Sequence, residues 1–392
     1  MSRFAQLGAS LLSLALIATA CSGSTPRPST SGSTTATTPT TSSPIAESQA
    51  LISSLPPDCD ASHPAAKATV AFVAQGRAWA AAPDGTALTC LFDITDPGPF
   101  LWGPRADRVL LGGLEVRGVG SKASRPSGSL QPTSVSWARP TGLAVAFVDP
   151  NGKELEKAVV GSSKIENVTP QEEEGHFPAL TDVTFQEVVY HPSGQAIGFV
   201  LTHRIDGSAI WVSSNTGGDP HRLVWSGTGT VFGPIAFGLD GKTLYYIAHL
   251  ANDTRLITAA DLGTGRLRPG LWAAKQNVLQ LVPAPSGQAV AIDTGTGCDD
   301  RVAVLSKLDE TGGSPLLPGA SAPTSVIGWV DDSTVLVSEG GCNDPARLWE
   351  VQANVGGTAT LLIDGVDRAA PRVPDPTPAP PLPNIPVNEE FA

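Results

Sequence analysis

The stretch VYHPSGQAIGFV, residues 189–200, decides the fold of this chain. An apolar strand ends at Tyr190, a turn of Pro, Ser and Gly follows, and a second apolar strand runs to Val200. β-Branched and aromatic residues on both sides favour pleated strands. Gly194 stands where a tight hairpin needs a positive φ. The stretch therefore predicts a β-hairpin.

Five further stretches repeat this order of strand, turn and strand. They are LWGPRADRVLL (101–111), SWARPTGLAVAFV (136–148), AFGLDGKTLYYIA (236–248), VPAPSGQAVAID (282–293) and GWVDDSTVLVSE (328–339). Successive copies are offset by 35, 53, 47, 46 and 46 residues. Further strands, such as SAIWVSS and HRLVWS, follow the hairpins. Periods of about 40–50 residues with four short strands are typical of propeller blades.

Three more strands precede the first copy and lack an inner partner: TVAFVAQ (69–75), RAWAAA (77–82) and ALTCLF (87–92). We expect residues 368–371, about one strand beyond the last blade, to complete this sheet, because propellers avoid an open edge in this way. The sequence therefore predicts an all-β, seven-bladed β-propeller with velcro closure. Six blades are the alternative, because the second unit is short.

The chain begins with an export signal. Arg3 precedes an apolar stretch that is too short to span a bilayer, and residues 18–21 read ATAC. This ending resembles the bacterial lipobox, although Ala18 stands where Leu is preferred. The resemblance implies a lipoprotein with acyl chains such as palmitate on Cys21, anchored to the cell membrane on its extracytoplasmic face. The alternative is an ordinary secretory signal cut after Ala20.

Composition divides the chain into four segments. Residues 1–20 are the signal peptide, residues 21–50 a Ser/Thr/Pro-rich linker, residues 51–370 the propeller, and residues 371–392 a Pro-rich tail. The linker and tail cannot bury a core, so we expect both to be disordered. O-glycans on the linker and a recognition motif in the tail are the alternatives.

The net charge of −12 bears on the kind of partner that the protein binds. The acidic chain has no cluster of Lys and Arg, so a nucleic acid partner is not expected.

An exported protein folds in an oxidising compartment, where cysteines pair. Cys298 and Cys342 lie one blade period apart in equivalent loops, while Cys59 and Cys90 bracket the first strands. We predict the disulfides Cys59–Cys90 and Cys298–Cys342, with a structural role.

Motifs for catalysis and metal binding are missing from the sequence. G-x-S-x-G is absent, and the six His show no metal-ligand spacing. No catalytic residue, metal or cofactor is predicted, and we do not expect an enzyme. His191 is interpreted as turn chemistry rather than a ligand. Trp102, Trp137 and Trp329 recur at equivalent positions and are interpreted as core between blades rather than sugar platforms.

Candidate binding residues lie in loops on one rim of the predicted propeller. The first group, His203, Arg204 and Asp206, lies between the second and third strands of one blade, with a solvated loop as the alternative. The second group comes from equivalent loops of two consecutive blades: Asp299, Asp300 and Asp344, with Asp293, Glu339 and Asn343 expected nearby. Such oxygen-rich loops are able to hold Ca²⁺, but loops tied by a disulfide are the favoured interpretation.

The hairpin repeat resembles the TolB-like or WD40-like (PD40) β-propeller repeat over roughly residues 69–367. Together with the signal and the linker, it resembles propeller lipoproteins of high-GC Gram-positive, actinobacterial type. The resemblance implies a monomeric, membrane-anchored propeller that binds an envelope protein as an interaction, scaffold or accessory module. The alternatives are a propeller that binds a small molecule or glycan, and a carboxylate-dependent hydrolase or lyase at the channel mouth.

Overall fold

The computed structural model describes most of the chain after residue 48. The described residues are 49–94, 100–105, 107–119, 132–171, 177–204, 207–226, 230–250, 252, 254–274, 276–307, 313–341, 344–353, 358–372 and 379–386. They form twenty-seven β-strands and two short 3₁₀ turns, η1 (Gly112–Leu114) and η2 (Leu180–Asp182). The signal peptide, Cys21 and nearly all of the linker lie outside these residues and stay predictions. No helix in this part of the chain is long and apolar enough to cross a membrane.

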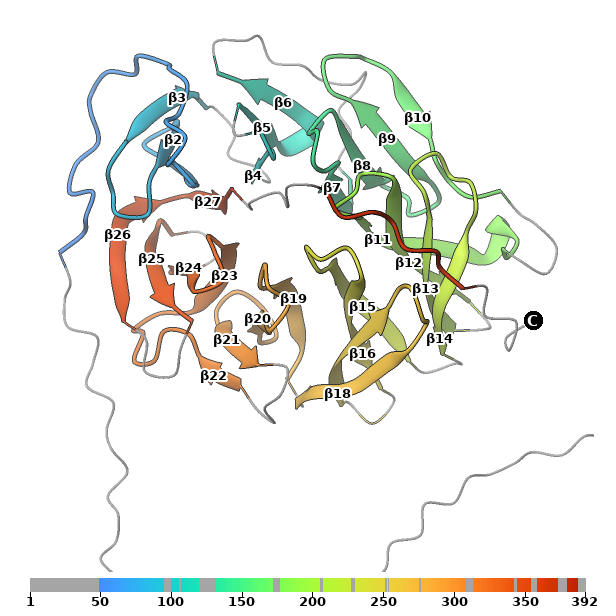
Figure 1. The fold of residues 1–392 in the computed structure, drawn as a ribbon. Helices are drawn as coiled ribbons and strands as arrows, with labels where there is room; N and C mark the ends of the chain where they lie inside the picture. Colours follow the sequence, from blue (N-terminus) through green and yellow to red (C-terminus); the bar gives the residue numbers. More distant parts are fainter. Residues whose placement is uncertain are drawn as a thin grey trace, which may run out of the picture. The chain divides into compact units, whose positions relative to one another are not determined.

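The strands form seven antiparallel sheets, arranged as the blades of a ring (Figure 1). Blade 1 consists of β27 (Arg368–Pro371), β1 (Val70–Ala74), β2 (Arg77–Ala81) and β3 (Thr89–Asp93). Blade 2 consists of β4 (Leu101–Trp102), β5 (Arg108–Leu111) and β6 (Glu115–Gly118). Blade 3 consists of β7 (Ser134–Trp137), β8 (Ala144–Val148), β9 (Leu155–Val159) and β10 (Ile165–Asn167). Blade 4 consists of β11 (Val183–Tyr190), β12 (Ala196–His203), β13 (Gly207–Ser214) and β14 (His221–Ser226).

The remaining blades have the same plan. Blade 5 consists of β15 (Val231–Phe237), β16 (Thr243–His249), β17 (Arg255–Asp261) and β18 (Leu267–Ala274). Blade 6 consists of β19 (Val278–Pro283), β20 (Ala289–Thr294), β21 (Val302–Lys307) and β22 (Gly313–Pro315). Blade 7 consists of β23 (Thr324–Trp329), β24 (Thr334–Glu339), β25 (Ala346–Gln352) and β26 (Ala359–Val366). The prediction of seven blades is confirmed, and the short second unit has three described strands.

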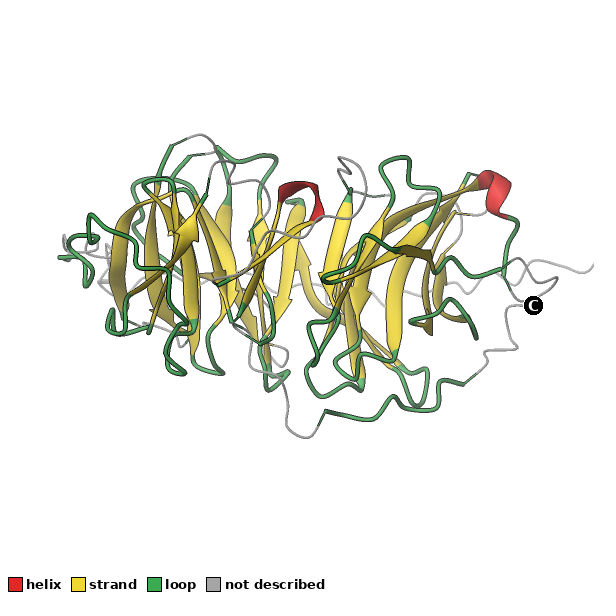
Figure 2. Cartoon of the chain, turned by 90° about the horizontal axis from the view of Figure 1, so that it is seen from above, coloured by secondary structure: helices red, strands yellow, loops and turns green. Residues whose placement is uncertain are grey.

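Strand direction alternates within each blade, so the connections emerge on two opposite faces of the ring (Figure 2). One face carries the turns from the first to the second strand and from the third to the fourth, and we call it the hairpin rim. The other carries the connections from the second to the third strand and from one blade to the next, and we call it the loop rim. The predicted binding residues belong to the loop rim.

The ring closes as the sequence predicts. Strand β27 pairs antiparallel with β1, with Phe72 opposite Ala369 and Val70 opposite Pro371. Beyond the paired residues, Arg372 N–H donates to the Thr69 carbonyl at 2.7 Å. The last strand in sequence is therefore the innermost strand of blade 1, and the velcro closure is confirmed.

The hairpin turns follow the local chemistry of the repeat. Gly194, Gly241 and Gly287 have φ values of 72°, 64° and 68°, the left-handed region that the turns require. His191 is fully buried in the first of these turns, where its Nδ1 accepts a hydrogen bond from Ser193 N–H at 3.1 Å. Its Nε2–H donates to the Gly241 carbonyl of the next blade at 2.8 Å. The interpretation of His191 as turn chemistry is confirmed, and the ring also joins blades 4 and 5.

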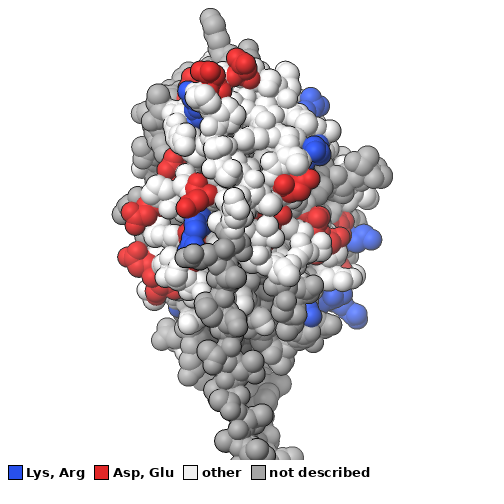
Figure 3. Space-filling model, turned by 90° about the vertical axis from the view of Figure 1, so that its left-hand side faces the viewer, with Lys and Arg blue, Asp and Glu red and all other residues white. Residues whose placement is uncertain are grey.

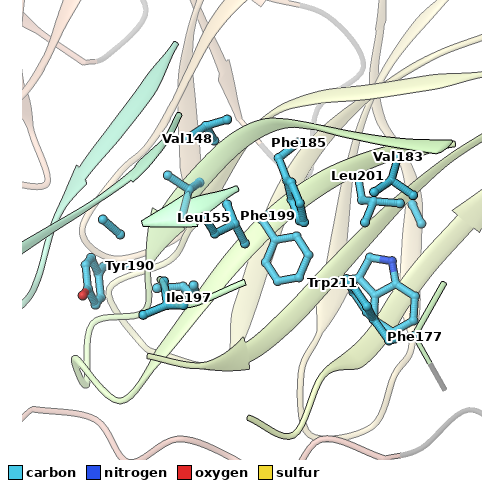
Figure 4. Packing of buried hydrophobic residues seen from close by; sticks show 14 of the residues in the cluster. Val148, Leu155, Phe177, Val183, Phe185, Tyr190, Ile197, Phe199, Leu201 and Trp211 are labelled. Atoms are coloured by element: carbon cyan, nitrogen blue, oxygen red, sulfur yellow. The ribbon is translucent and has the colours of Figure 1, made fainter. Parts of the chain in front are cut away.

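Apolar side chains on facing sheets form the core between blades. Figure 4 shows the junction of blades 3 and 4, where Leu155 packs among the aromatic side chains of blade 4. Phe177 meets Trp211 edge to face, with ring centroids 4.9 Å apart. The three Trp residues of the repeat are buried as predicted: Trp102, Trp137 and Trp329 are 6%, 8% and 1% exposed. They are part of the core.

The first described residues fasten the chain to blades 7 and 1. Leu51 and Ile52 N–H groups donate to the carbonyls of Leu361 and Leu362 in β26, and Ile52 forms a parallel bridge to Ile363. Farther on, Cys59 forms the predicted disulfide with Cys90 in β3, with Cα atoms 5.3 Å apart. The N-terminal segment therefore runs from the outer strand of blade 7 to the outer strand of blade 1.

The Pro-rich tail differs from the expectation of disorder at residues 379–386. Residues 379–386 lie against the ring, and Ile385 is only 6% exposed within the apolar cluster between blades 4 and 5. Leu382 packs on the same cluster. These two apolar side chains in an otherwise Pro-rich segment supply the burial that the composition alone did not indicate.

Charged side chains are scattered over the side at the left of Figure 1. Acidic groups are more frequent there than basic ones among the described residues (Figure 3). Most of that surface is uncharged.

Candidate binding face on the loop rim

The first predicted group lies on the loop rim of blade 4, as expected. His203 is the last residue of β12, and Arg204 follows it on the exposed surface. Arg204 N–H donates to the Asp182 carbonyl at 3.2 Å, and its Nε lies 3.7 Å from the Asp182 carboxylate. Both side chains are exposed, so this ion pair is weak. Asp206 lies outside the described residues.

The second predicted group lies in the loops after β20 and β24. Asp300 accepts hydrogen bonds from Thr296 N–H and Gly297 N–H, each at 2.9 Å, and from the Thr296 hydroxyl. These bonds hold the pKa of Asp300 below its usual range. Asp299 and Asp344 are exposed. The Asp300 carboxylate thus stabilises the loop in which it lies.

The same loop carries Cys298, which is disulfide-bonded. Its predicted partner, Cys342, lies outside the described residues, as does Asn343. The Cys298–Cys342 pairing therefore stays a prediction.

Asp293 and Glu339 are buried behind these loops and have separate protein partners. Asp293 accepts from the Ser325 hydroxyl at 2.5 Å and from Val326 N–H of blade 7 at 2.6 Å, while burial raises its pKa. Glu339 accepts a hydrogen bond from Trp349 Nε1–H at 2.9 Å and forms an ion pair with Arg347, with 2.9 Å between Nη2 and Oε1. Over the described ranges, no three His, Cys, Asp or Glu residues come together in a way that suits a metal ion.

A series of three arginines on the loop rim was missed from the sequence. Arg255, Arg301 and Arg347 are spaced 46 residues apart, which is the blade period. Each stands at the start of a third strand and donates to a polar side chain near the start of an inner strand. The acceptors are Asn277 at 2.9 Å, Ser325 at 3.2 Å and Ser321 at 2.9 Å. Their 46-residue spacing is the signal in the sequence that could have indicated them.

Exposed apolar side chains lie on the same rim, in blades 4 to 6. Trp225 and Val231 are each 44% exposed, and they flank the connection from blade 4 to blade 5. Leu279, near the start of β19, is 38% exposed, and Val302, the first residue of β21, is 39% exposed. We call these four residues the apolar rim residues. In the sequence they are part of apolar strands, so nothing distinguished them from core.

A second residue that sequence reasoning missed is Glu187, on the inner strand β11. It lies at a β-bulge, and its Oε2 accepts a hydrogen bond from Ile235 N–H of the neighbouring inner strand at 3.0 Å. Burial among the inner strands raises the pKa of Glu187 to about 7. A carboxyl group that titrates near neutral pH is suited to proton transfer. A single Glu in a strand pattern gives no such signal in the sequence.

Comparison with solved structures finds many propellers of similar fold. An oligogalacturonate lyase in complex with manganese matches with a TM-score of 0.52 and 12% identity, over 71% of this chain and 83% of that chain. The oligogalacturonate lyase of Vibrio parahaemolyticus matches with a TM-score of 0.51 and 10% identity, over 72% and 84%. TolB from Acinetobacter baumannii matches with a TM-score of 0.44 and 14% identity, over 77% and 66%.

The similarity is one of fold. At 10–14% identity these structures carry no site across to this chain. No protein-family model matches the sequence, and no curated protein matches it. The two lyase structures, with TM-scores above 0.5, thus support the β-propeller, whereas the TolB-like family and the actinobacterial lipoprotein type stay predictions.

Proposed function

We propose that this chain is a membrane-anchored, extracytoplasmic interaction module that binds an envelope protein through the loop rim of blades 4 to 6. The observation that carries this proposal is the set of exposed apolar rim residues on the same rim as Arg255 and Arg301. Exposed apolar side chains with a polar surround are typical of protein-binding surfaces, where Trp and Arg are enriched.

Rigid support of the loop rim favours binding. Asp293, Asp300 and Glu339 accept hydrogen bonds from their own blade or the next, so the loops are already ordered. Less conformational entropy is then lost when a partner binds. Asp293, Asp300 and Glu339 thus support the loops of the proposed binding face.

The anchor and the compartment rest on separate evidence. The Cys59–Cys90 disulfide is typical of an oxidising compartment, which supports export. The anchor itself rests on the sequence around Cys21. In the host, Cys21→Ala should move the protein from the membrane fraction to the soluble fraction or leave it unprocessed. A variant that matures and fractionates like wild type contradicts the anchor.

The test of the binding face compares two exposed apolar positions on opposite rims. A photo-crosslinking amino acid replaces Trp225 on the loop rim or Leu143 on the hairpin rim, which are 44% and 45% exposed. In the native envelope, the Trp225 position should capture a defined protein and the Leu143 position should not. The proposal is wrong if both capture the same proteins or if neither captures any. Trp225→Ser should abolish capture from a crosslinker at Val302.

Glu187 favours a second candidate function, carboxylate-dependent cleavage of a glycan near the channel. A Glu with a pKa of about 7 is able to take up and release the proton in such a step. The assay incubates the full chain with oligogalacturonate and follows the ultraviolet absorbance of unsaturated products. Turnover by wild type and its loss in Glu187→Gln support this candidate, and no turnover by wild type removes it for this substrate.

A further inference from the structure

The hairpin rim between blades 4 and 5 holds an extended segment of the chain itself. Residues 379–386, APPLPNIP, are drawn in red in Figure 1 and cross blade 4. Pro380 lies against the hairpin of Gly241, where an added Cβ would come within 2.7 Å of Pro380 Cγ. Pro383 lies beside Gly263, in the turn between β17 and β18. The segment therefore packs on successive turns of one rim.

Burial along this segment repeats every three residues. Leu382 and Ile385 pack into the apolar cluster between blades 4 and 5, while Pro381 and Asn384 are exposed. Three residues per turn is the period of polyproline II, a conformation with no internal hydrogen bonds. Residues 379–386 likewise have no regular secondary structure. Pro380, Leu382, Pro383 and Ile385 thus form one face that contacts the ring.

The surface that receives this face has the features of a polyproline II receptor. Next to Pro380, the His191 and Phe237 rings meet edge to face at 5.1 Å, and the glycine at 241 leaves room for the proline ring. Leu262, fully buried, belongs to the cluster that receives Ile385. Aromatic rings and apolar pockets spaced for every third residue are the usual means of binding Pro-rich peptides.

We propose that this surface is a binding site for Pro-rich peptides of the pattern P-x-L-P-x-I, occupied in this structure by the chain's own residues 379–386. The partner it fits is an extended, Pro-rich segment of another protein. The covalent connection keeps the chain's own segment at an effective concentration of about millimolar, so it competes with any such partner. This site is on the opposite rim from the proposed envelope contact and is independent of it.

The experiment frees the site in the full chain and adds the peptide back. Leu382→Ser/Ile385→Ser removes both apolar anchors, and a fluorescent peptide APPLPNIP is titrated into this variant and into wild type. We expect the variant to bind at least about tenfold more tightly, because its site is vacant. Gly263→Trp, added to the variant, should weaken binding, and a peptide with Ser at both anchor positions should not bind.

A second experiment tests the proposal if the double variant does not fold. A protease site inserted at residues 373–378 allows the connection to be cut after folding, and the released fragment is removed by gel filtration. Labelled peptide should then bind the cleaved protein. Absence of binding up to about 1 mM in cleaved protein that keeps its circular dichroism spectrum overturns the proposal. Equal affinity of intact wild type and the freed proteins shows that the segment does not occupy the site, and also overturns it.

Discussion

Glu350 illustrates how one residue sets a pH dependence. It lies on β25, where its Oε1 atom is buried without a hydrogen bond partner among the described residues. Burial, together with the nearby carboxylates of Asp331 and Asp84, raises the pKa of Glu350 to about 7 from an ordinary value of 4.5. The folded chain therefore holds this proton more tightly than the unfolded chain between those pH values. The stability due to Glu350 falls as the pH rises through that range.

Glu350→Gln should consequently raise the melting temperature at pH 8 and leave it nearly unchanged at pH 5. The amide resembles the protonated carboxyl, so only the penalty of the ionised form is removed. Glu339→Gln is the matched control. Glu339 accepts three hydrogen bonds and forms an ion pair with Arg347, so this variant should be destabilised at both pH values. Thermal unfolding at the two pH values tests this prediction. An equal change of melting temperature at both pH values in Glu350→Gln contradicts it.

Single residues also show why the site was harder to predict than the core. The roles of Trp329 and His191 follow from their residue type and their position in the repeat, and the interpretation of both is confirmed. Trp225 and Val302 differ from core residues only in lying where a strand ends, and exposure there depends on how blades pack. Glu187 has its raised pKa because neighbouring inner strands surround it. Neither the exposure of Trp225 and Val302 nor the raised pKa of Glu187 can be inferred from the local sequence.

At the scale of elements, the hairpin turns were predictable because their chemistry is local. What the sequence did not indicate is how closely the turns of successive blades approach. A Cβ added to Gly194 would collide with the Arg139 carbonyl of blade 3. Gly161 also has a positive φ, 83°, but a Cβ there would meet nothing within 4 Å.

Gly161 and Gly194 allow the cost of a side chain at positive φ to be measured separately from the cost of a collision with the neighbouring blade. Gly161→Ala should cost about 1 kcal/mol, the usual penalty for a side chain at positive φ. Gly194→Ala should cost clearly more, because the hairpin must also move away from blade 3. Urea unfolding of both variants measures the difference, and equal losses would show that the contact between hairpins contributes nothing.

The two segments that pack beyond the repeat show the limit of pattern reasoning. The parallel pairing of Leu51 and Ile52 with β26 depends on which blade closes the ring, which is a non-local fact. Likewise, Leu382 and Ile385 stand in a Pro-rich composition that indicates disorder, and they are ordered because they pack on the apolar cluster between blades 4 and 5. Both segments carry too few apolar residues to be recognised as elements.

At the scale of the whole molecule, stability depends on the seam between blades 7 and 1. Cys59→Ser/Cys90→Ser should lower the free energy of unfolding by about 3 kcal/mol, because the disulfide closes a loop across a sequence separation of 31. Urea unfolding with and without a reducing agent tests this. Reducing agent should destabilise wild type more than the double variant. A wild-type protein that is insensitive to loss of this bond contradicts the prediction.

The same seam determines how the molecule responds to mechanical load. A pull on the chain before Leu51 first meets the two backbone hydrogen bonds to β26. Once they part, the load falls on the hydrogen bond that the Pro57 carbonyl accepts from Arg77 Nη1 at 2.6 Å. Tension then reaches Cys59 and crosses its covalent bond to Cys90, on an outer strand. The residues between the two cysteines, which include β1 and β2, are bypassed, so the inner pair of β1 and β27 is not drawn open. Under tension from its N-terminal side, a propeller built in this way loses the few hydrogen bonds before Cys59 and keeps its ring closed.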